Sequence, residues 1–141
     1  MKQLPFICLL LLLAPFIGCK PENKLMTTEP LKNISGAWKI IGATQNGTDL
    51  MPYFNFSNFR ITFTDSTYTL DSLVPFIVKA NGKWAFNDPQ YPFAIVFTPT
   101  DSAGVTSPLQ FPVVGGVRNL IITFSPGCPQ NSYQYTLQQA Q

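Results

Sequence analysis

The stretch Gly36-Ala37-Trp38-Lys39-Ile40-Ile41 begins the part of the chain in which nearly every segment predicts a β-strand. Farther on, Phe59-Arg60-Ile61-Thr62-Phe63-Thr64 alternates apolar with polar side chains. Successive side chains of a strand point to opposite faces, so this period of two predicts strands with one buried face. Further strands are predicted, with turn residues between them, at residues 67–70, 83–86, 93–97, 109–114, 118–124 and 133–137. No segment keeps a helical period.

The number of strands stays open at one place in the middle of the chain. Residues 74–80 form either a short strand of their own or an irregular continuation past Pro75. Asn81-Gly82 follows, and it predicts a tight hairpin turn because both residues tolerate positive φ. We therefore expect an all-β chain of eight or nine strands, arranged as a closed antiparallel up-and-down barrel or as a β-sandwich.

The triplet Gly36-Ala37-Trp38 resembles the Gly-x-Trp motif of lipocalins and other calycin-type barrels, and Gly82-Lys83-Trp84 repeats it in mid-chain. The resemblance implies an eight-stranded antiparallel up-and-down barrel over residues 35–141. It places Gly36 and Trp38 at the closed end, with a late arginine, here Arg118, packed over the indole. The order of segments is similar to that of lipocalin-like lipoproteins of Gram-negative bacteria, a family of unknown function.

Strand direction supports a contact between the side chains of Arg118 and Trp38. Arg118 shares its strand parity with the apolar residues Leu120, Ile122 and Phe124, so it points inward or caps the end of the barrel. The penultimate strand of an up-and-down barrel runs parallel to the first, so both residues begin their strands at the same end. We expect the guanidinium to stack on the indole. The alternative is an edge residue that extends to solvent.

The first residues have the features of a secretory signal. Met1-Lys2 precedes an uncharged apolar run over residues 4–17, and Gly18 stands directly before Cys19. The run is shorter than the roughly 20 residues that span a bilayer. A cysteine after the small residue resembles the lipobox of bacterial lipoproteins. It implies a lipoprotein signal peptide at residues 1–18 and a lipidated Cys19 that carries acyl chains such as palmitate. The alternative is an ordinary signal peptide with a chance cysteine.

Residues 19–34 are expected to form a lipidated flexible tether, because they hold prolines and charges but little apolar periodicity. Two or three acyl chains anchor a protein stably where one does not. We therefore expect attachment to a membrane of the bacterial cell envelope through the N-terminal lipid. The outer membrane is the expected one, and the leaflet is left open.

Composition excludes several function classes. Lys2 lies in the signal, so eight of the nine Lys and Arg residues remain against seven Asp and Glu, which argues against nucleic-acid binding. The sequence has no histidine, which excludes Ser-His-Asp and Cys-His catalysis and the usual zinc sites. Its carboxylates are scattered. We expect no enzyme activity, no metal and no cofactor.

The segment between the first two strong strands, residues 46–58, carries Tyr53, Phe54 and Phe56. Lipocalins have at this position the loop that covers the barrel opening. The segment is therefore expected to act as a lid or a partner-contact loop, or else to fold back and fill the barrel.

Function is expected to depend on recognition. Tyr68, Trp84 and Tyr135 are further candidates to line a ligand site, and an eight-stranded barrel has room for its own side chains or one small ligand. The first hypothesis is binding of a small apolar or amphipathic ligand in the envelope. The alternative is a filled barrel that acts as a surface interaction or accessory module through its loops, with a protein partner that the sequence does not identify.

Overall fold

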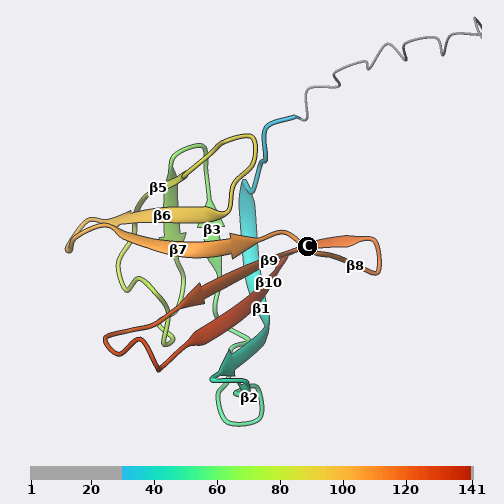
Figure 1. Cartoon of the computed structure of the whole chain (residues 1–141), viewed down its shortest axis with the longest axis vertical. Helices are drawn as coiled ribbons and strands as arrows, with labels where there is room; N and C mark the ends of the chain where they lie inside the picture. Colours follow the sequence, from blue (N-terminus) through green and yellow to red (C-terminus); the bar gives the residue numbers. More distant parts are fainter. Residues whose placement is uncertain (1–29, 141) are drawn as a thin grey trace, which may run out of the picture.

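The computed structural model describes residues 30–140 of the chain, and this part is all-β (Figure 1). The expected signal peptide, Cys19 and most of the expected tether lie outside the described residues. Within them there is no helix and there are ten strands: β1 Gly36–Gln45, β2 Thr48–Asp49, β3 Ile61–Phe63, β4 Thr67–Leu70, β5 Gly82–Phe86, β6 Ala94–Pro99, β7 Val105–Gln110, β8 Val113–Val114, β9 Val117–Phe124 and β10 Tyr133–Gln139.

Eight of these strands close into an antiparallel barrel. Each pairs with the next in the order β1, β3, β4, β5, β6, β7, β9, β10, and β10 pairs again with β1. Because the connections join neighbouring strands, the barrel is of the up-and-down type. The two shortest strands are additions, since β2 pairs with β1 and β8 pairs with β9. The eight-stranded barrel is confirmed, and the β-sandwich alternative is wrong.

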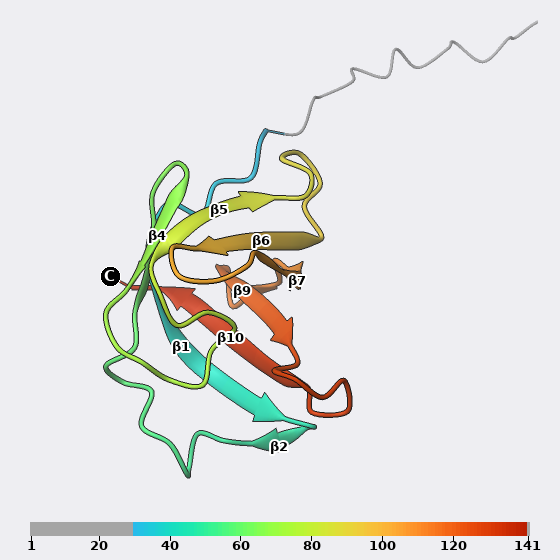
Figure 2. The same cartoon turned by 90° about the vertical axis from the view of Figure 1, so that its left-hand side faces the viewer.

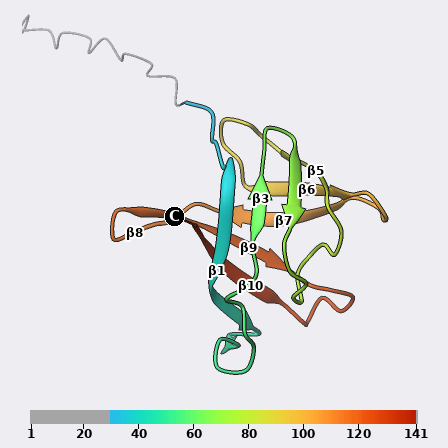
Figure 3. The ribbon, with the colours of Figure 1, turned by 180° about the vertical axis from the view of Figure 1, so that it is seen from behind.

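The connections divide between two ends of the barrel. One end, here called the mouth, carries the connections from β1 to β3, from β4 to β5, from β6 to β7 and from β9 to β10. The opposite closed end carries the β3–β4 and β5–β6 connections, the β8 hairpin and the end of β10 (Figures 1 and 3). Residues 30–35 lead into β1 at the closed end.

Inward-facing strand residues form the core, as the alternating pattern predicts. Leu120 and Ile122 of β9 lie opposite Leu137 and Tyr135 of β10, and all four are fully buried. At the closed end the Trp38 indole is buried, and its N–H donates to the carbonyl oxygen of Ile34 at 2.8 Å. Ile34, expected as the last residue of the tether, is itself part of this core.

The prediction of a hairpin turn at Asn81-Gly82 is wrong. Residues 74–80 form no strand, and Gly82 is the first residue of β5. A Cβ at Gly82 would lie 2.2 Å from the Thr98 carbonyl oxygen, so glycine is needed because the β6 backbone approaches closely. The Asn81 side chain accepts a hydrogen bond from the Leu70 N–H at 2.9 Å and so extends the β4–β5 pairing.

A Gly82→Ala substitution tests this close approach. The methyl group would push β5 away from β6, and we expect the free energy of unfolding to fall by about 1–3 kcal/mol. Gly42→Ala is the matched control, because its Cβ would meet only ordinary contacts, the nearest at 3.6 Å. Urea denaturation followed by tryptophan fluorescence measures both, and equal stability of the two variants would contradict the argument.

Candidate functional site

The β4–β5 connection fills the barrel at the mouth. Residues 74–80 of this connection, here called the plug, cross the opening in the view along the barrel (Figure 2). The Phe76 side chain is only 4% exposed. Its ring lies 5.2 to 6.2 Å, between centroids, from four aromatic rings of the barrel: Phe59, Phe97, Phe124 and Tyr135. Phe76 therefore occupies the place where a ligand of an open barrel would lie.

Two buried tyrosines hold the plug from inside the barrel. The Tyr135 hydroxyl donates a short hydrogen bond to the carbonyl oxygen of Pro75. The Tyr68 hydroxyl donates to the carbonyl oxygen of Ala80 at 2.8 Å. Burial raises the pKa of each tyrosine to about 12, with smaller contributions from the charges of Asp101 and Tyr133 respectively. Both hydroxyls thus keep their protons and remain donors, and they fix the plug near both of its ends.

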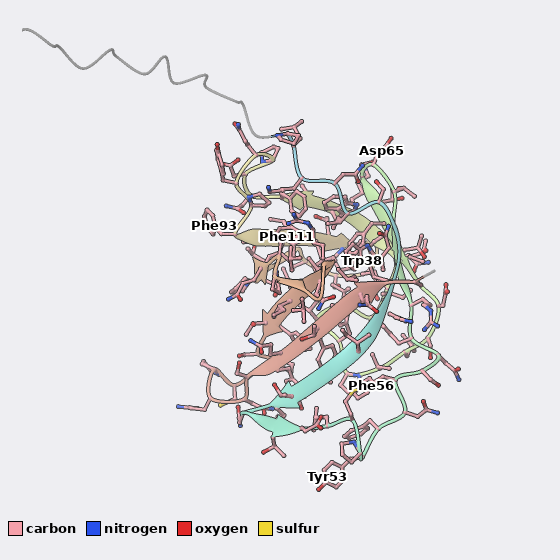
Figure 4. All side chains as sticks on the ribbon, turned by 90° about the vertical axis from the view of Figure 1, so that its right-hand side faces the viewer. Trp38, Tyr53, Phe56, Asp65, Phe93 and Phe111 are labelled. Carbon is pink, nitrogen blue, oxygen red and sulfur yellow. The ribbon has the colours of Figure 1, made fainter. Side chains whose placement is uncertain are left out.

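The loop between β2 and β3 contributes one aromatic side chain to the interior and presents two to solvent. Phe56 is buried, with its ring 5.7 Å from that of Tyr135. Tyr53 is 75% exposed and Phe54 is 49% exposed. Figure 4 shows Tyr53 at the outer tip of the loop and Phe56 closer to the barrel. The two roles expected for this segment are therefore divided among its residues: Phe56 helps to fill the barrel, and the other two remain available for contact.

The remaining candidate residues do not form an open ligand site. Tyr68 and Tyr135 are inside the barrel, where their hydroxyls are used by the plug. Trp84 lies in the half of the barrel toward the closed end, where its indole N–H donates to the Thr64 carbonyl oxygen at 3.0 Å. Its ring contacts those of Phe63 and Phe86, at 5.2 and 5.0 Å. Trp84 therefore lies away from the mouth loops.

The expected stacking of Arg118 on Trp38 is wrong. The register through β10 does place both residues at the closed end, since Asn119 pairs with Gln138 and Trp38 with Gln139. Arg118, however, pairs with Val113 in the β8–β9 hairpin, which extends past the barrel. It is exposed there, and among residues 30–140 its guanidinium has no recorded hydrogen bond, ion pair or ring contact.

A cleft opens in the barrel wall beside the plug, between the mouth ends of β7 and β9. These strands pair over only two residue positions, Leu109 with Ile122 and Gln110 with Ile121. The Leu109 N–H donates to the carbonyl oxygen of Phe93, the residue just before β6. Leu109 therefore faces β6, and the preceding residue Pro108, which has no N–H, faces β9 and interrupts the ladder. The resulting cleft has a volume of about 520 Å³, and its lining includes Ile77 of the plug.

The sequence interpretation missed the plug and this cleft. The plug lies within Val74-Pro75-Phe76-Ile77-Val78, an apolar run that Pro75 interrupts. Such a run is too irregular for a strand and too apolar for a solvated loop, and that combination is the signal that could have identified it. Pro108 could have indicated the interrupted pairing between β7 and β9.

Within the described residues, no three His, Cys, Asp or Glu side chains gather in a way that could hold a metal ion. No helix of residues 30–140 is long and apolar enough to cross a membrane.

The amino-acid sequence of the chain matches the model of one protein family. The model of the domain of unknown function DUF5004 matches residues 20–138, so the chain is a member of this family. The match takes in all of the barrel strands, with only Gln139 of β10 beyond it. The search of curated proteins found no match. The search of solved structures also found none.

The plug is expected to be a main source of stability. Phe76→Ala leaves a cavity among four aromatic rings, so we expect the free energy of unfolding to fall by about 3–5 kcal/mol. Phe54→Ala removes the same side chain from an exposed position and should cost less than about 1 kcal/mol. Denaturant unfolding measures both. If the two substitutions cost the same, Phe76 does not fill the barrel.

The buried tyrosines predict a loss of stability at high pH. An unfolded tyrosine releases its proton near pH 10, whereas Tyr68 and Tyr135 hold theirs to about 12. The unfolded state then binds fewer protons between these values, so stability falls as pH rises from 10 to 12, by up to about 3 kcal/mol per tyrosine. Unfolding curves of Tyr135→Phe should show a shallower fall than the parent protein, and an unchanged slope would contradict the assignment.

Proposed function

We propose that the protein is a lipid-anchored, non-enzymatic accessory module of the bacterial cell envelope. Its lipocalin-like barrel is filled by its own side chains and acts through the loops at its mouth. The observation that carries the proposal is the contrast between Phe76, which occupies the interior, and Tyr53 and Phe54, which stand exposed at the same end. The lipobox resemblance at Cys19 supports the anchor.

The plug argues against a permanently open ligand-binding barrel. A ligand in the interior would have to displace Phe76, whose burial is worth about 2–3 kcal/mol. It would also have to break the hydrogen bonds to Pro75 and Ala80, at about 1 kcal/mol each. Together these terms come to about 4–5 kcal/mol and would weaken an intrinsic affinity by roughly a thousandfold.

The mouth surface has the composition of a recognition site. Met51, Tyr53, Phe54 and Leu73 are all exposed there. The Tyr53 and Phe54 N–H groups both donate to the Leu50 carbonyl oxygen, at 3.0 and 3.1 Å, so the loop has a defined backbone. Aromatic side chains with few rotatable bonds provide large contact area at low entropic cost. The partner that fits is a protein of the envelope with an apolar pocket or strip.

The absence of histidine from the sequence supports a non-enzymatic role. Asp49, Asp71 and Asp101 belong to the mouth end and Asp65 and Asp88 to the closed end, so these carboxylates are spread over the barrel.

The cleft between β7 and β9 favours a second candidate function. Its volume falls in the range of small-molecule sites, and its lining mixes apolar residues such as Val105 and Pro108 with hydroxyl groups such as that of Thr123. A small amphipathic molecule could bind there without displacing Phe76. This candidate retains the ligand-binding hypothesis but moves the ligand from the interior to the wall.

The anchor and the two modes of recognition can be tested on one preparation. We expect the mass of the protein extracted from bacterial membranes to equal that of residues 19–141 plus acyl chains, and Cys19→Ala to lose both the acyl mass and the membrane association. A photo-crosslinking residue at position 53 should form a defined protein adduct that Phe54→Ser removes. The same residue at Ile41, exposed on the barrel wall, should form none.

Ligand binding in the cleft between β7 and β9 predicts a different experimental result. A small molecule that co-purifies in native mass spectrometry, and is lost in Ile77→Trp, would favour the cleft over the mouth loops. An unmodified Cys19 in membranes would overturn the anchor.

A further inference from the structure

The closed end carries exposed apolar side chains that the barrel does not use. Phe93 is 70% exposed and Tyr91 is 59% exposed, both on the β5–β6 connection. Hydrogen bonds hold this connection in shape: Asp88 accepts from the Gln90 and Tyr91 N–H groups at 2.8 and 3.0 Å. The two rings are therefore presented to solvent by an ordered loop, and Figure 4 shows Phe93 at the edge of the barrel, pointing outward.

The β8–β9 hairpin adds a second apolar surface at this end. Val114 pairs with Val117 across a two-residue turn, Gly115-Gly116, in which both residues have positive φ, 59° and 79°. Val113, Val114 and Val117 are exposed, and the tip has no charged side chain before Arg118. Apolar side chains grouped on a hairpin that extends from the barrel into water indicate a contact surface.

Residues 30–35, which lead into β1, lie at the same end. The Lys32 N–H donates to the Pro89 carbonyl oxygen at 3.2 Å, so the entering segment lies against the loop that carries Tyr91 and Phe93. Only ten residues, Lys20 to Glu29, separate Cys19 from Pro30. Even fully extended they would reach about 35 Å. A lipid on Cys19 would therefore keep the closed end near the membrane.

The net charge of the closed end is small. Lys32, Lys39 and Arg118 there exceed Asp65 and Asp88 by one positive charge. Over residues 20–29, Lys20 and Lys24 are matched by Glu22 and Glu29. Because the excess is a single charge, a contact made by this end would be mainly apolar.

We propose that the closed end is a membrane-contact surface. Phe93, Tyr91 and the valines of the β8–β9 hairpin enter the boundary between lipid headgroups and acyl chains, and the mouth faces away from the bilayer. The proposal rests on the anchor at Cys19 that is part of the proposed function. Its partner is a neutral lipid surface, so the contact should be insensitive to salt.

The test attaches the mature chain to vesicles without relying on acylation in the cell. A Cys128→Ser variant of residues 19–141 is coupled through the Cys19 thiol to a maleimide lipid in phosphatidylcholine vesicles whose acyl chains carry bromine, a contact quencher of tryptophan. Phe93→Trp and Val114→Trp report on the closed end, and Tyr53→Trp is the matched exposed position at the mouth. The parent protein, with Trp38 and Trp84, gives the background.

We expect the added tryptophans at positions 93 and 114 to lose roughly half of their emission, because side chains at the interface lie about 5–10 Å deep. The tryptophan at position 53 should keep its emission, and raised salt should change none of the three. Phe93→Trp combined with Val114→Asp should recover emission.

Three results would overturn the proposal. They are quenching at position 53 instead of 93 and 114, no quenching at any position on attached protein, and a concentration-dependent shift in free protein that assigns the surface to a second copy. Because attachment is chemical, these results are independent of whether Cys19 is acylated in cells. An unmodified Cys19 would instead contradict the proposed anchor.

Discussion

The contact between the Phe76 ring and the four aromatic rings around it is the constraint on which the barrel interior depends. Eight strands enclose a space that must be filled, because protein interiors are as closely packed as organic crystals and an empty apolar void forfeits contacts on all its walls. Strand residues such as Ile61 and Leu120 fill the middle and the closed end. Toward the mouth the plug supplies what they leave, and two tyrosine hydroxyls satisfy backbone carbonyls that would otherwise be buried without partners.

Alternation along the chain was sufficient to predict most of the fold, because a half-buried strand shows its two faces directly in the sequence. Alternation was insufficient where contacts with distant parts of the chain decide the conformation. Residues 74–78 are apolar for a reason that only the closed barrel reveals. Gly82 resembled a turn residue, yet it is glycine because of the Thr98 carbonyl oxygen, far from it in sequence. Arg118 has the parity of an inward residue, but the barrel ends before it and the hairpin carries it into solvent.

The candidate site could likewise be predicted from the sequence only in part. Tyr53, Phe54 and Phe56 could be identified as a group, because three aromatic residues in a loop are unusual. Which of them faces the interior could not, because loops have no fixed period from which to assign a face. Phe56 is buried because it meets Tyr135, a residue almost eighty positions later in the chain. The cleft beside the plug depends likewise on Pro108 facing β9 rather than β6, a choice that only the strand register settles.

A filled interior limits how a change at one end of the barrel can affect the other end. In an open barrel, ligand entry at the mouth can alter the interior and so the far end, whereas here Phe76 and Phe56 close that route with rigid rings. In the proposed role the barrel is a spacer of fixed length, with residues 30–35 at one end and the exposed loop of Tyr53 and Phe54 at the other. The loop that carries Tyr53 and Phe54 is joined to the plug through the interior, because Phe56 contacts Tyr135 and Tyr135 donates to Pro75. The exposed aromatic side chains of this loop are therefore preorganised, and little conformational entropy remains to be lost when a partner binds. The recognition proposed at the mouth would therefore depend on the same packing that stabilises the fold.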